Sequence, residues 1–253
     1  MCWFKYTGMA LLFSLLIPAA NATPFTFWAA DGWTQFANDD GHVGPGAGGQ
    51  AFDAEYLYYK LDGNTLSLGL QTGFDVIDGI QVHSSDYYYA GDLALSFDGD
   101  ASTYEYGIDF GLLTKDYSSH TKAVSDPTGR VDMGSGTGID PAGLYAVNTW
   151  NVGVYSGHHV ADPFAMDIGS LDRSLLSNDA GSGSPGGQTS YYRMVSFDLT
   201  GLGNAVAAHW TMSCGNDYIN GDFSYDVPEP TPLSLLGLGL VGMGLLRRRK
   251  ARM

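Results

Sequence analysis

Five Asp-Gly steps constrain the fold of this chain more than any other feature of its sequence. They begin at Asp31, Asp40, Asp62, Asp78 and Asp98. Glycine takes the positive φ that tight turns need, and aspartate bonds its own backbone there, so each step is a turn candidate. Helical periodicity is weak outside the two chain ends. The steps are therefore interpreted as turns between short strands.

The runs on either side of the third step have the pattern of a β-hairpin. Leucines at 66, 68 and 70 alternate with small or polar residues, which is the period of a half-buried strand. We therefore expect residues 54–61 to pair with residues 65–72. A second hairpin is expected, as are three further strands; the ranges are 92–98 with 103–110, then 145–155, 191–199 and 205–213.

The same patterns define the expected fold class. Only residues 163–176 could hold a short helix, and the Gly/Ser-rich stretches 41–49 and 178–188 are expected to be surface loops. About 200 residues with many short strands predict an all-β body, a single β-sandwich or jelly-roll-like domain over residues 23–226.

The chain ends in three consecutive segments of different character. They are Val227-Pro228-Glu229-Pro230, an uncharged apolar run over 233–246, and Arg247-Arg248-Arg249-Lys250. As a helix the run spans roughly 21 Å, less than the ~30 Å hydrocarbon core of a bilayer. Positive charge stays on the cytoplasmic side, so everything before Val227 is expected to lie outside the cytoplasmic membrane.

This order of segments resembles the PEP-CTERM sorting signal of Gram-negative bacteria. Pro228, Glu229 and Pro230 match the motif itself, and the resemblance covers residues 227–250. It implies recognition by an exosortase, a transpeptidase-like membrane enzyme that cuts near the Pro-Glu-Pro and passes the body to the cell surface or extracellular matrix. The alternative is an ordinary tail anchor, which needs neither this preface nor so short a span.

The N-terminus has the pattern of a secretory signal peptide. Lys5 supplies the positive charge, residues 9–17 the apolar stretch, and Ala20 and Ala22 the small-x-small cleavage site. We expect export by the Sec machinery, cleavage by signal peptidase after Ala22, and a mature chain that begins at Thr23. The expected parts are a signal peptide (1–22), a body (23–226) and a sorting signal (227–253) that anchors the chain in the membrane before processing.

Removal of both signals leaves an acidic body. The full chain has 12 Lys and Arg and 27 Asp and Glu, a formal charge of −15. Six of the basic residues and one acidic residue lie in the signals, which leaves 6 basic and 26 acidic residues and a charge of −20. Such a surface repels nucleic acid, which is excluded as a partner, and it favours divalent cations. Cys214 is then the sole cysteine, so no internal disulfide is expected.

The acidic turns offer candidate calcium ligands. Asp98 and Asp100 are two residues apart with glycine between them, so both carboxylates could turn onto one ion. The alternative is that the Asp-Gly pair is turn chemistry alone. The sequence does not decide between a calcium site and a turn. Structural calcium is the one cofactor that it suggests.

The sequence contains no convincing catalytic set. Cys214 invites a pairing with His209 as base and Asp217 as orienting group, but positions 209 and 214 face opposite sides of a regular strand. A buried structural cysteine is therefore favoured, with a metal-binding or intermolecular thiol as the alternative. The HExxH, CxxC and GxSxG patterns are absent from the sequence. We expect that the protein is not an enzyme.

Tyr87, Tyr88 and Tyr89 form the candidate ligand-binding site. Three consecutive tyrosines cannot all face inward on one strand, so an outward ring could stack on a sugar. The simpler interpretation is that these tyrosines are strand residues with half-buried rings. The leading prediction is a non-catalytic structural or adhesive protein of the envelope or exopolysaccharide. The alternative is a surface carbohydrate-binding module that uses exposed tyrosines and acidic loops.

Overall fold

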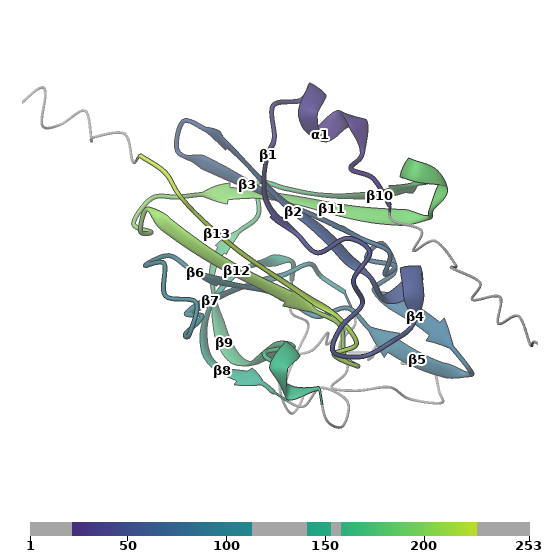
Figure 1. The fold of residues 1–253 in the computed structure, drawn as a ribbon. Coiled ribbons are helices and arrows are strands. Elements are labelled where there is room, and N and C mark those ends of the chain that lie inside the picture. The colour runs from purple at the N-terminus through teal and green to yellow at the C-terminus, as the bar shows by residue number, and fades with distance from the viewer. Residues whose placement is uncertain (1–21, 113–140, 153–157, 227–253) are drawn as a thin grey trace, which may run out of the picture.

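The computed structural model describes residues 22–112, 141–152 and 158–226, and their regular structure is nearly all strand (Figure 1). One short helix, α1 (Thr26–Ala30), precedes the first strand. Three 3-10 turns cover Gly49–Phe52, His159–Ala161 and Pro185–Gly187. The thirteen strands in these residues are β1 (Thr34–Asn38), β2 (Ala54–Asp62), β3 (Thr65–Thr72), β4 (Ile80–His83), β5 (Asp86–Tyr89), β6 (Leu93–Ser96), β7 (Tyr106–Asp109), β8 (Gly143–Asn151), β9 (Ala165–Ser174), β10 (Ser177–Gly183), β11 (Ser190–Asp198), β12 (Ala205–Thr211) and β13 (Tyr218–Ser224).

These strands form three antiparallel sheets. The five-stranded sheet has the order β1-β2-β3-β11-β10, and the six-stranded sheet has the order β13-β12-β6-β7-β8-β9. The hairpin β4-β5 stands apart from both. Each large sheet joins early and late strands of the chain, because β11 pairs with β3 and β12 pairs with β6.

Side chains from both large sheets meet in one hydrophobic cluster. Leu57, Leu68 and Val195 come from the five-stranded sheet, and Ile108 and Trp210 come from the six-stranded one. Each is at most 2 % exposed. Full burial of one such side chain stabilises the fold by about 1.5–3 kcal/mol. This shared core is what holds the two sheets together.

Both predicted hairpins are confirmed. β2 pairs antiparallel with β3, with Asp62 opposite Thr65 across the turn, and β6 pairs antiparallel with β7. The glycines of all five Asp-Gly steps have φ between 57° and 82°, the left-handed region that turns use. Four of the steps connect strands as predicted, whereas the first, Asp31-Gly32, connects α1 to β1. The strands expected at 145–155, 191–199 and 205–213 correspond to β8, β11 and β12, although residues 153–155 lie outside the described part.

The prediction of a short helix within residues 163–176 is wrong. This segment contains β9, the edge strand of the six-stranded sheet, which pairs with β8 through three register irregularities. Only its first residues, Ala165 and Met166, are buried. The ladder to β8 satisfies the backbone of β9, and this tertiary pairing outweighs the weak local preference.

The surface-loop prediction is correct for residues 41–49 and wrong for much of 178–188. Ser177–Gly183 is β10, paired with β11 at every position. An edge strand needs a partner on one side and little side-chain packing, so Gly- and Ser-rich sequence can form one. Residues 41–48 form no strand and lead into the 3-10 turn at Gly49–Phe52.

The helix α1 was not predicted, because five residues are too few to show a helical period. It packs on the five-stranded sheet, on the face opposite the main core (Figure 1). Trp28 is 1 % exposed and stacks on Tyr58 with ring centroids 4.4 Å apart. Gln71 of β3 accepts hydrogen bonds from Trp28 Nε1 at 2.8 Å and from the Phe25 amide at 3.1 Å. The N-terminal segment therefore covers Tyr56 and Tyr58 of β2.

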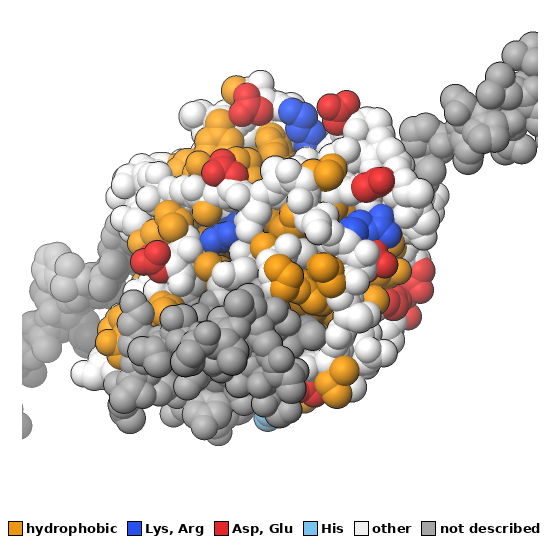
Figure 2. All heavy atoms as spheres, turned by 180° about the vertical axis from the view of Figure 1, so that it is seen from behind, with side chains coloured by type: hydrophobic (Ala, Val, Ile, Leu, Met, Phe, Trp, Pro, Cys, Tyr) orange, Lys and Arg blue, Asp and Glu red, His pale blue; other side chains and the backbone are white. Residues whose placement is uncertain are grey.

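The surface charge and the chain ends complete the description. Figure 2 shows acidic side chains spread over one face rather than gathered in a single patch.

No helix within the described ranges is long and apolar enough to cross a membrane. Residues 1–21 and the expected apolar helix at 233–246 lie outside those ranges.

Candidate ligand-binding groove

Two adjacent hollows open beside β13. The first, of about 370 Å³, lies between the loop after β1 and β13. The second, of about 570 Å³, lies beside residues 101–104 and β8. Both are lined by Val160 and Asn220. We therefore treat the two hollows as one feature, called here the β13 groove.

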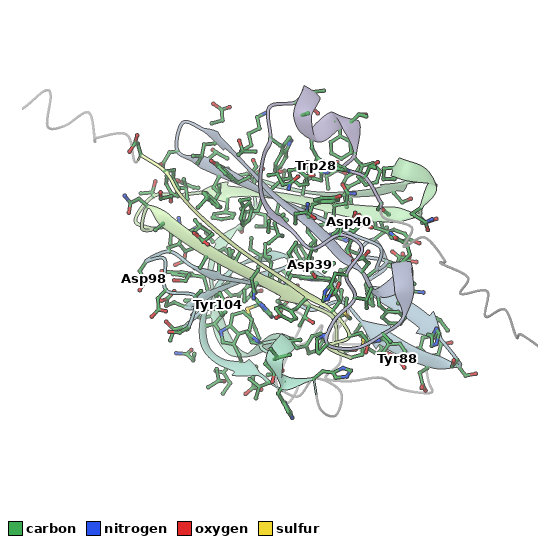
Figure 3. The ribbon with its side chains drawn as sticks, viewed as in Figure 1. Trp28, Asp39, Asp40, Tyr88, Asp98 and Tyr104 are labelled. Atoms are coloured by element: carbon green, nitrogen blue, oxygen red, sulfur yellow. The ribbon has the colours of Figure 1, made fainter. Side chains whose placement is uncertain are left out.

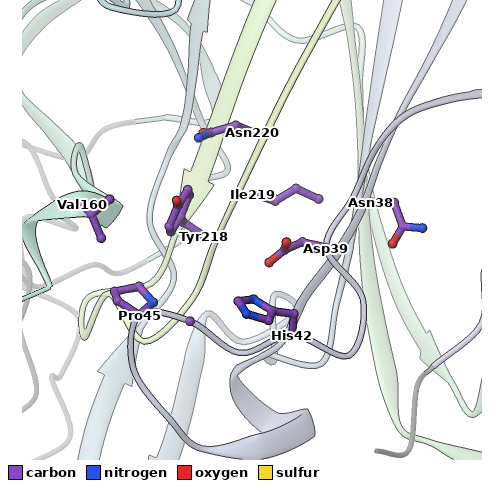
Figure 4. A pocket seen from close by; sticks show the side chains of 9 residues that line it. Asn38, Asp39, His42, Pro45, Val160, Tyr218, Ile219 and Asn220 are labelled. Carbon is purple, nitrogen blue, oxygen red and sulfur yellow. The ribbon is translucent and has the colours of Figure 1, made fainter.

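The first hollow is lined mainly by polar side chains. Figure 4 shows Asp39 and His42 on one side and Val160 on the other, with Tyr218 and Asn220 of β13 between them. Burial raises the pKa of Asp39, and the nearby His42 opposes this rise. A ligand here would meet a carboxyl, an imidazole and an amide beside one aromatic ring.

The second hollow has an aromatic wall. Trp150 Nε1 donates to the carbonyl oxygen of Tyr104 at 2.7 Å, which holds the indole in place. Tyr104 of this hollow and Tyr218 of the first hollow flank His209, each with its ring centroid 5.9 Å from the imidazole. These rings from three separate segments give the groove flat apolar surfaces, which suit the faces of sugar rings.

His209 belongs to this wall and is not an open base. It is 2 % exposed, and burial lowers its pKa. Its Nδ1 lies 2.5 Å from the side-chain oxygen of Asn220, and its Nε2 lies 3.0 Å from the carbonyl oxygen of Ala161. Both ring nitrogens therefore have partners within the protein.

The charge of the groove limits its ligands. Asp39 and Asp162 are among the residues that line it, and the described lining includes no lysine or arginine. A carboxylate, phosphate or sulfate ligand would find no lysine or arginine side chain to pair with in the described lining. The groove is suited to a neutral polar ligand.

Three carboxyl groups are buried in one part of the protein, where the charge of Asp53 acts on both Glu55 and Asp217. Asp53, Glu55 and Asp217 are each at most 2 % exposed. Burial raises the pKa of Asp53 to about 6, of Glu55 to about 7 and of Asp217 to about 8. Asp217 accepts the Gly44 amide at 3.1 Å and the Ala54 amide at 2.6 Å. It thereby fastens the β1–β2 loop to the turn before β13.

The segment 214–217 completes this attachment. Asn216 accepts the Gly46 amide at 2.8 Å on its backbone oxygen, and its side chain donates to the carbonyl of Ala47. Gly215 has φ 59°, which lets the chain turn back at this point. Asn216 and Asp217 are called here the loop clamp. The sequence offered one sign of it, two polar residues in the expected turn before the last strand, but their partners are more than 160 residues away.

Cys214 is buried, as predicted. It is 1 % exposed and packs in the main core. Burial raises the pKa of its thiol to about 12, so the thiolate that a nucleophile requires is not formed at neutral pH. Cys214 therefore acts as a core residue at the start of the clamp.

Asp98 and Asp100 lie in an exposed turn. Asp98 accepts the Ser96 hydroxyl at 2.7 Å and the Asp100 amide at 2.8 Å, and Asp100 accepts both the hydroxyl and the amide of Ser102. These bonds lower the pKa of both carboxyls. No group of three His, Cys, Asp or Glu among the described residues is placed to hold a metal ion. Asp98 and Tyr88 lie at opposite sides of the molecule, so the two predicted sites do not converge (Figure 3).

The three tyrosines of the other predicted site lie on β5. Tyr89 is fully buried in a small cluster with Phe164, so its ring is enclosed. Tyr88 is half-buried, with its ring centroid 5.3 Å from that of Phe52. Tyr87 is also half-buried and packs on the same small cluster as Tyr89. The aromatic residues that line a hollow are Tyr104, Trp150 and Tyr218, and none of them belongs to the predicted site at Tyr87, Tyr88 and Tyr89.

Comparison with known protein families identifies the segment at the C-terminus. Residues 226–250 match the PEP-CTERM protein-sorting motif. The chain carries a PEP-CTERM sorting signal. This confirms the resemblance found in the sequence, and the motif implies an exported protein that an exosortase processes for the surface or the extracellular space. No curated protein and no solved structure matches this chain.

The groove and the sorting signal are neighbours in the sequence. β13 ends at Ser224, and the motif begins at residue 226. The loop clamp directly precedes β13. The last strand before the sorting signal is therefore also the strand that carries Tyr218 and Asn220 of the groove.

Proposed function

We propose that this protein is a non-catalytic structural or adhesive component of the cell surface or extracellular matrix, delivered there by Sec export and exosortase processing. The sorting motif at residues 226–250 carries the proposal. The signal-peptide pattern at 1–22 supports export. The body at 23–226 would be a β-sandwich, because the two large sheets share one core.

The strongly perturbed groups support a structural role. Asp217 ties two backbone amides, and Glu55 accepts bonds from Gln50, Ser190 and Gln71. Cys214 is buried with a raised pKa. Each of these groups is occupied in holding the chain together, so none is prepared to attack a substrate.

The second candidate function is carbohydrate binding at the β13 groove. The observation that favours it is the lining, in which Tyr104, Trp150 and Tyr218 stand beside the amides of Asn148 and Asn220. Aromatic faces with a few polar side chains are the common chemistry of sugar sites. In this version the protein would hold exopolysaccharide through the groove, and the Tyr87–Tyr89 strand would be a structural support.

The first experiment determines both ends of the protein in its native host. Intact mass and terminal peptides would be measured for protein from the envelope and from the medium. The expected chain begins at Thr23 and ends near Pro228. A chain that retains residues 233–252 would overturn exosortase processing. Glu229→Ala is the matched variant, because it removes the central residue of the motif and leaves the apolar run and the arginines in place.

A further inference from the structure

The expected signal-peptide cleavage point lies inside the folded body. Ala22 is 2 % exposed. Its carbonyl oxygen accepts the Tyr56 hydroxyl at 3.4 Å, and its amide donates to the carboxylate of Asp40. Ala22, the residue that cleavage would remove, therefore occupies a specific place beside an acidic side chain.

The next residue is held independently of Ala22. The carbonyl oxygen of Thr23 accepts a hydrogen bond from Gln71 Nε2 at 2.9 Å. The same nitrogen donates to Glu55 at 2.7 Å, and the oxygen of this amide accepts from Trp28. Because these bonds do not involve Ala22, removal of Ala22 leaves Thr23 where it is.

One carboxylate oxygen of Asp40 and one of its electrostatic neighbour Asp53 have no hydrogen-bond partner. They are Oδ1 of Asp40 and Oδ1 of Asp53, and both atoms are buried. Asp53 is 2 % exposed, and the charges of Asp40 and Asp39 both act on it. Buried carboxylate oxygens without a donor are costly, and the cost is relieved by a cation that can donate hydrogen bonds.

We propose that this acidic pocket is the binding site for the protein's own processed N-terminus, in which the α-amino group of Thr23 pairs with Asp40 and Asp53. Signal peptidase hydrolyses the Ala22–Thr23 bond with one water, so Ala22 leaves with a new carboxylate. Thr23 keeps an amine that takes up a proton at neutral pH. Consecutive Cα atoms are about 3.8 Å apart, so the new ammonium lies within one residue of the amide that already bonds Asp40.

The inference deepens the proposed function, since it depends on export with cleavage after Ala22. It gives cleavage a second consequence besides release from the membrane. In the uncleaved chain Asp40 interacts with the Tyr56 hydroxyl and with the neutral amide of Ala22, whereas the processed chain replaces this amide by a cation with three donors. The N-terminal segment would thus be attached most firmly to the five-stranded sheet after processing.

The test measures the chemical reactivity of the terminal amine in the processed protein from its host. An amine-directed acylating reagent is added near neutral pH, and modification of the Thr23 peptide is followed by mass spectrometry. Native protein is expected to react at least about tenfold more slowly than the same protein in urea, because a paired, enclosed ammonium is a poor nucleophile. Equal rates in the two states would overturn the inference.

Variants separate ion pairing from simple enclosure. Asp40→Asn is expected to bring the native rate most of the way to the unfolded one. Asp31→Asn, at an exposed position of the same segment, is the matched control and should react like the wild type. Protection that survives Asp40→Asn would overturn the pairing. If Asp40→Asn does not fold, Asp53→Asn replaces it.

The same peptides distinguish failure of this inference from failure of the proposed sorting. A native chain that begins at a residue other than Thr23 overturns the inference and leaves exosortase processing intact, because the motif is at the other end of the chain. If the chain begins at Thr23 and its amine is fully reactive, the ion pair is overturned and the proposed export and processing still stand.

Discussion

Two regions of this protein are rich in aromatic residues, but the chain itself fills the space over the rings in only one of them. On the outer face of the five-stranded sheet, Trp28 covers Tyr58 and fills the space over it. In the β13 groove, Tyr104 and Trp150 line a hollow of about 570 Å³ that the described chain leaves open. The comparison teaches that a cluster of aromatic residues becomes a candidate ligand site only where the chain does not supply the occupant itself.

The sharpest way to test this comparison is to remove one tryptophan from each region. Trp28→Ala is expected to lower the free energy of unfolding by about 3–5 kcal/mol, because it empties a fully buried position. Trp150→Ala removes a half-buried ring at an open hollow and should cost much less. Chemical denaturation of both variants measures the difference. Equal losses would mean that the groove is part of the core.

The loop clamp gives the next largest effect. Asp217→Asn replaces one acceptor oxygen by a donor that faces a backbone amide, either of Gly44 or of Ala54. We expect a loss of about 1–3 kcal/mol in unfolding free energy. Asp222→Asn, on an exposed position of β13, is the control and should change little. A clamp variant as stable as this control would show that the β1–β2 loop is held by other contacts.

The buried carboxyls predict an unusual dependence of stability on pH. Burial raises the pKa of Asp217 to about 8 in the folded protein, whereas in the unfolded chain it has the ordinary value of 3.8. The folded state therefore binds the proton more tightly. The resulting stability is complete below about pH 4 and is lost as pH rises through about 8.

We expect unfolding free energy to fall by on the order of 2 kcal/mol between pH 5 and pH 9. Denaturation across this range should show the decline in the wild type and a flatter profile in Asp217→Asn. A wild-type profile that rises with pH would mean that Asp217 is ionised in the fold and has a cationic partner.

Structure that depends on residues close together in the sequence could be predicted, whereas structure that depends on contacts between distant segments could not. Asp62-Gly63 sets its own turn, so the β2-β3 hairpin could be read directly from the chain. Tyr104 and Tyr218 are brought together by the strand order of the six-stranded sheet, and no local pattern carries that information. β9 was mistaken for a helix for the same reason, since its structure comes from pairing with β8. The sorting signal was predictable because it is a contiguous segment.

Sugar binding is the test for the β13 groove, the aromatic region that the described chain leaves open. If the groove holds a neutral glycan, loss of one stacking ring in Tyr104→Ala should weaken binding to host exopolysaccharide by up to about tenfold, which corresponds to about 1.4 kcal/mol. Calorimetry or retention on immobilised polysaccharide measures this. Tyr192→Ala is the control, because its ring packs beside Phe27 under the N-terminal segment. Equal binding by wild type and Tyr104→Ala would remove the groove from consideration as a sugar site.

The smallest effect is expected at Asp98 and Asp100, far from both aromatic regions. Their hydrogen bonds are local and exposed, so Asp100→Asn should change the free energy of unfolding by less than about 0.5 kcal/mol. Thermal unfolding with and without added calcium decides what these carboxylates do. If they hold calcium, the ion raises the melting temperature of the wild type and not of Asp100→Asn, because an ion bound to the folded state alone stabilises it. If they serve the turn alone, calcium shifts both proteins equally or not at all. We expect the second result, because each carboxylate already accepts two hydrogen bonds within its own turn.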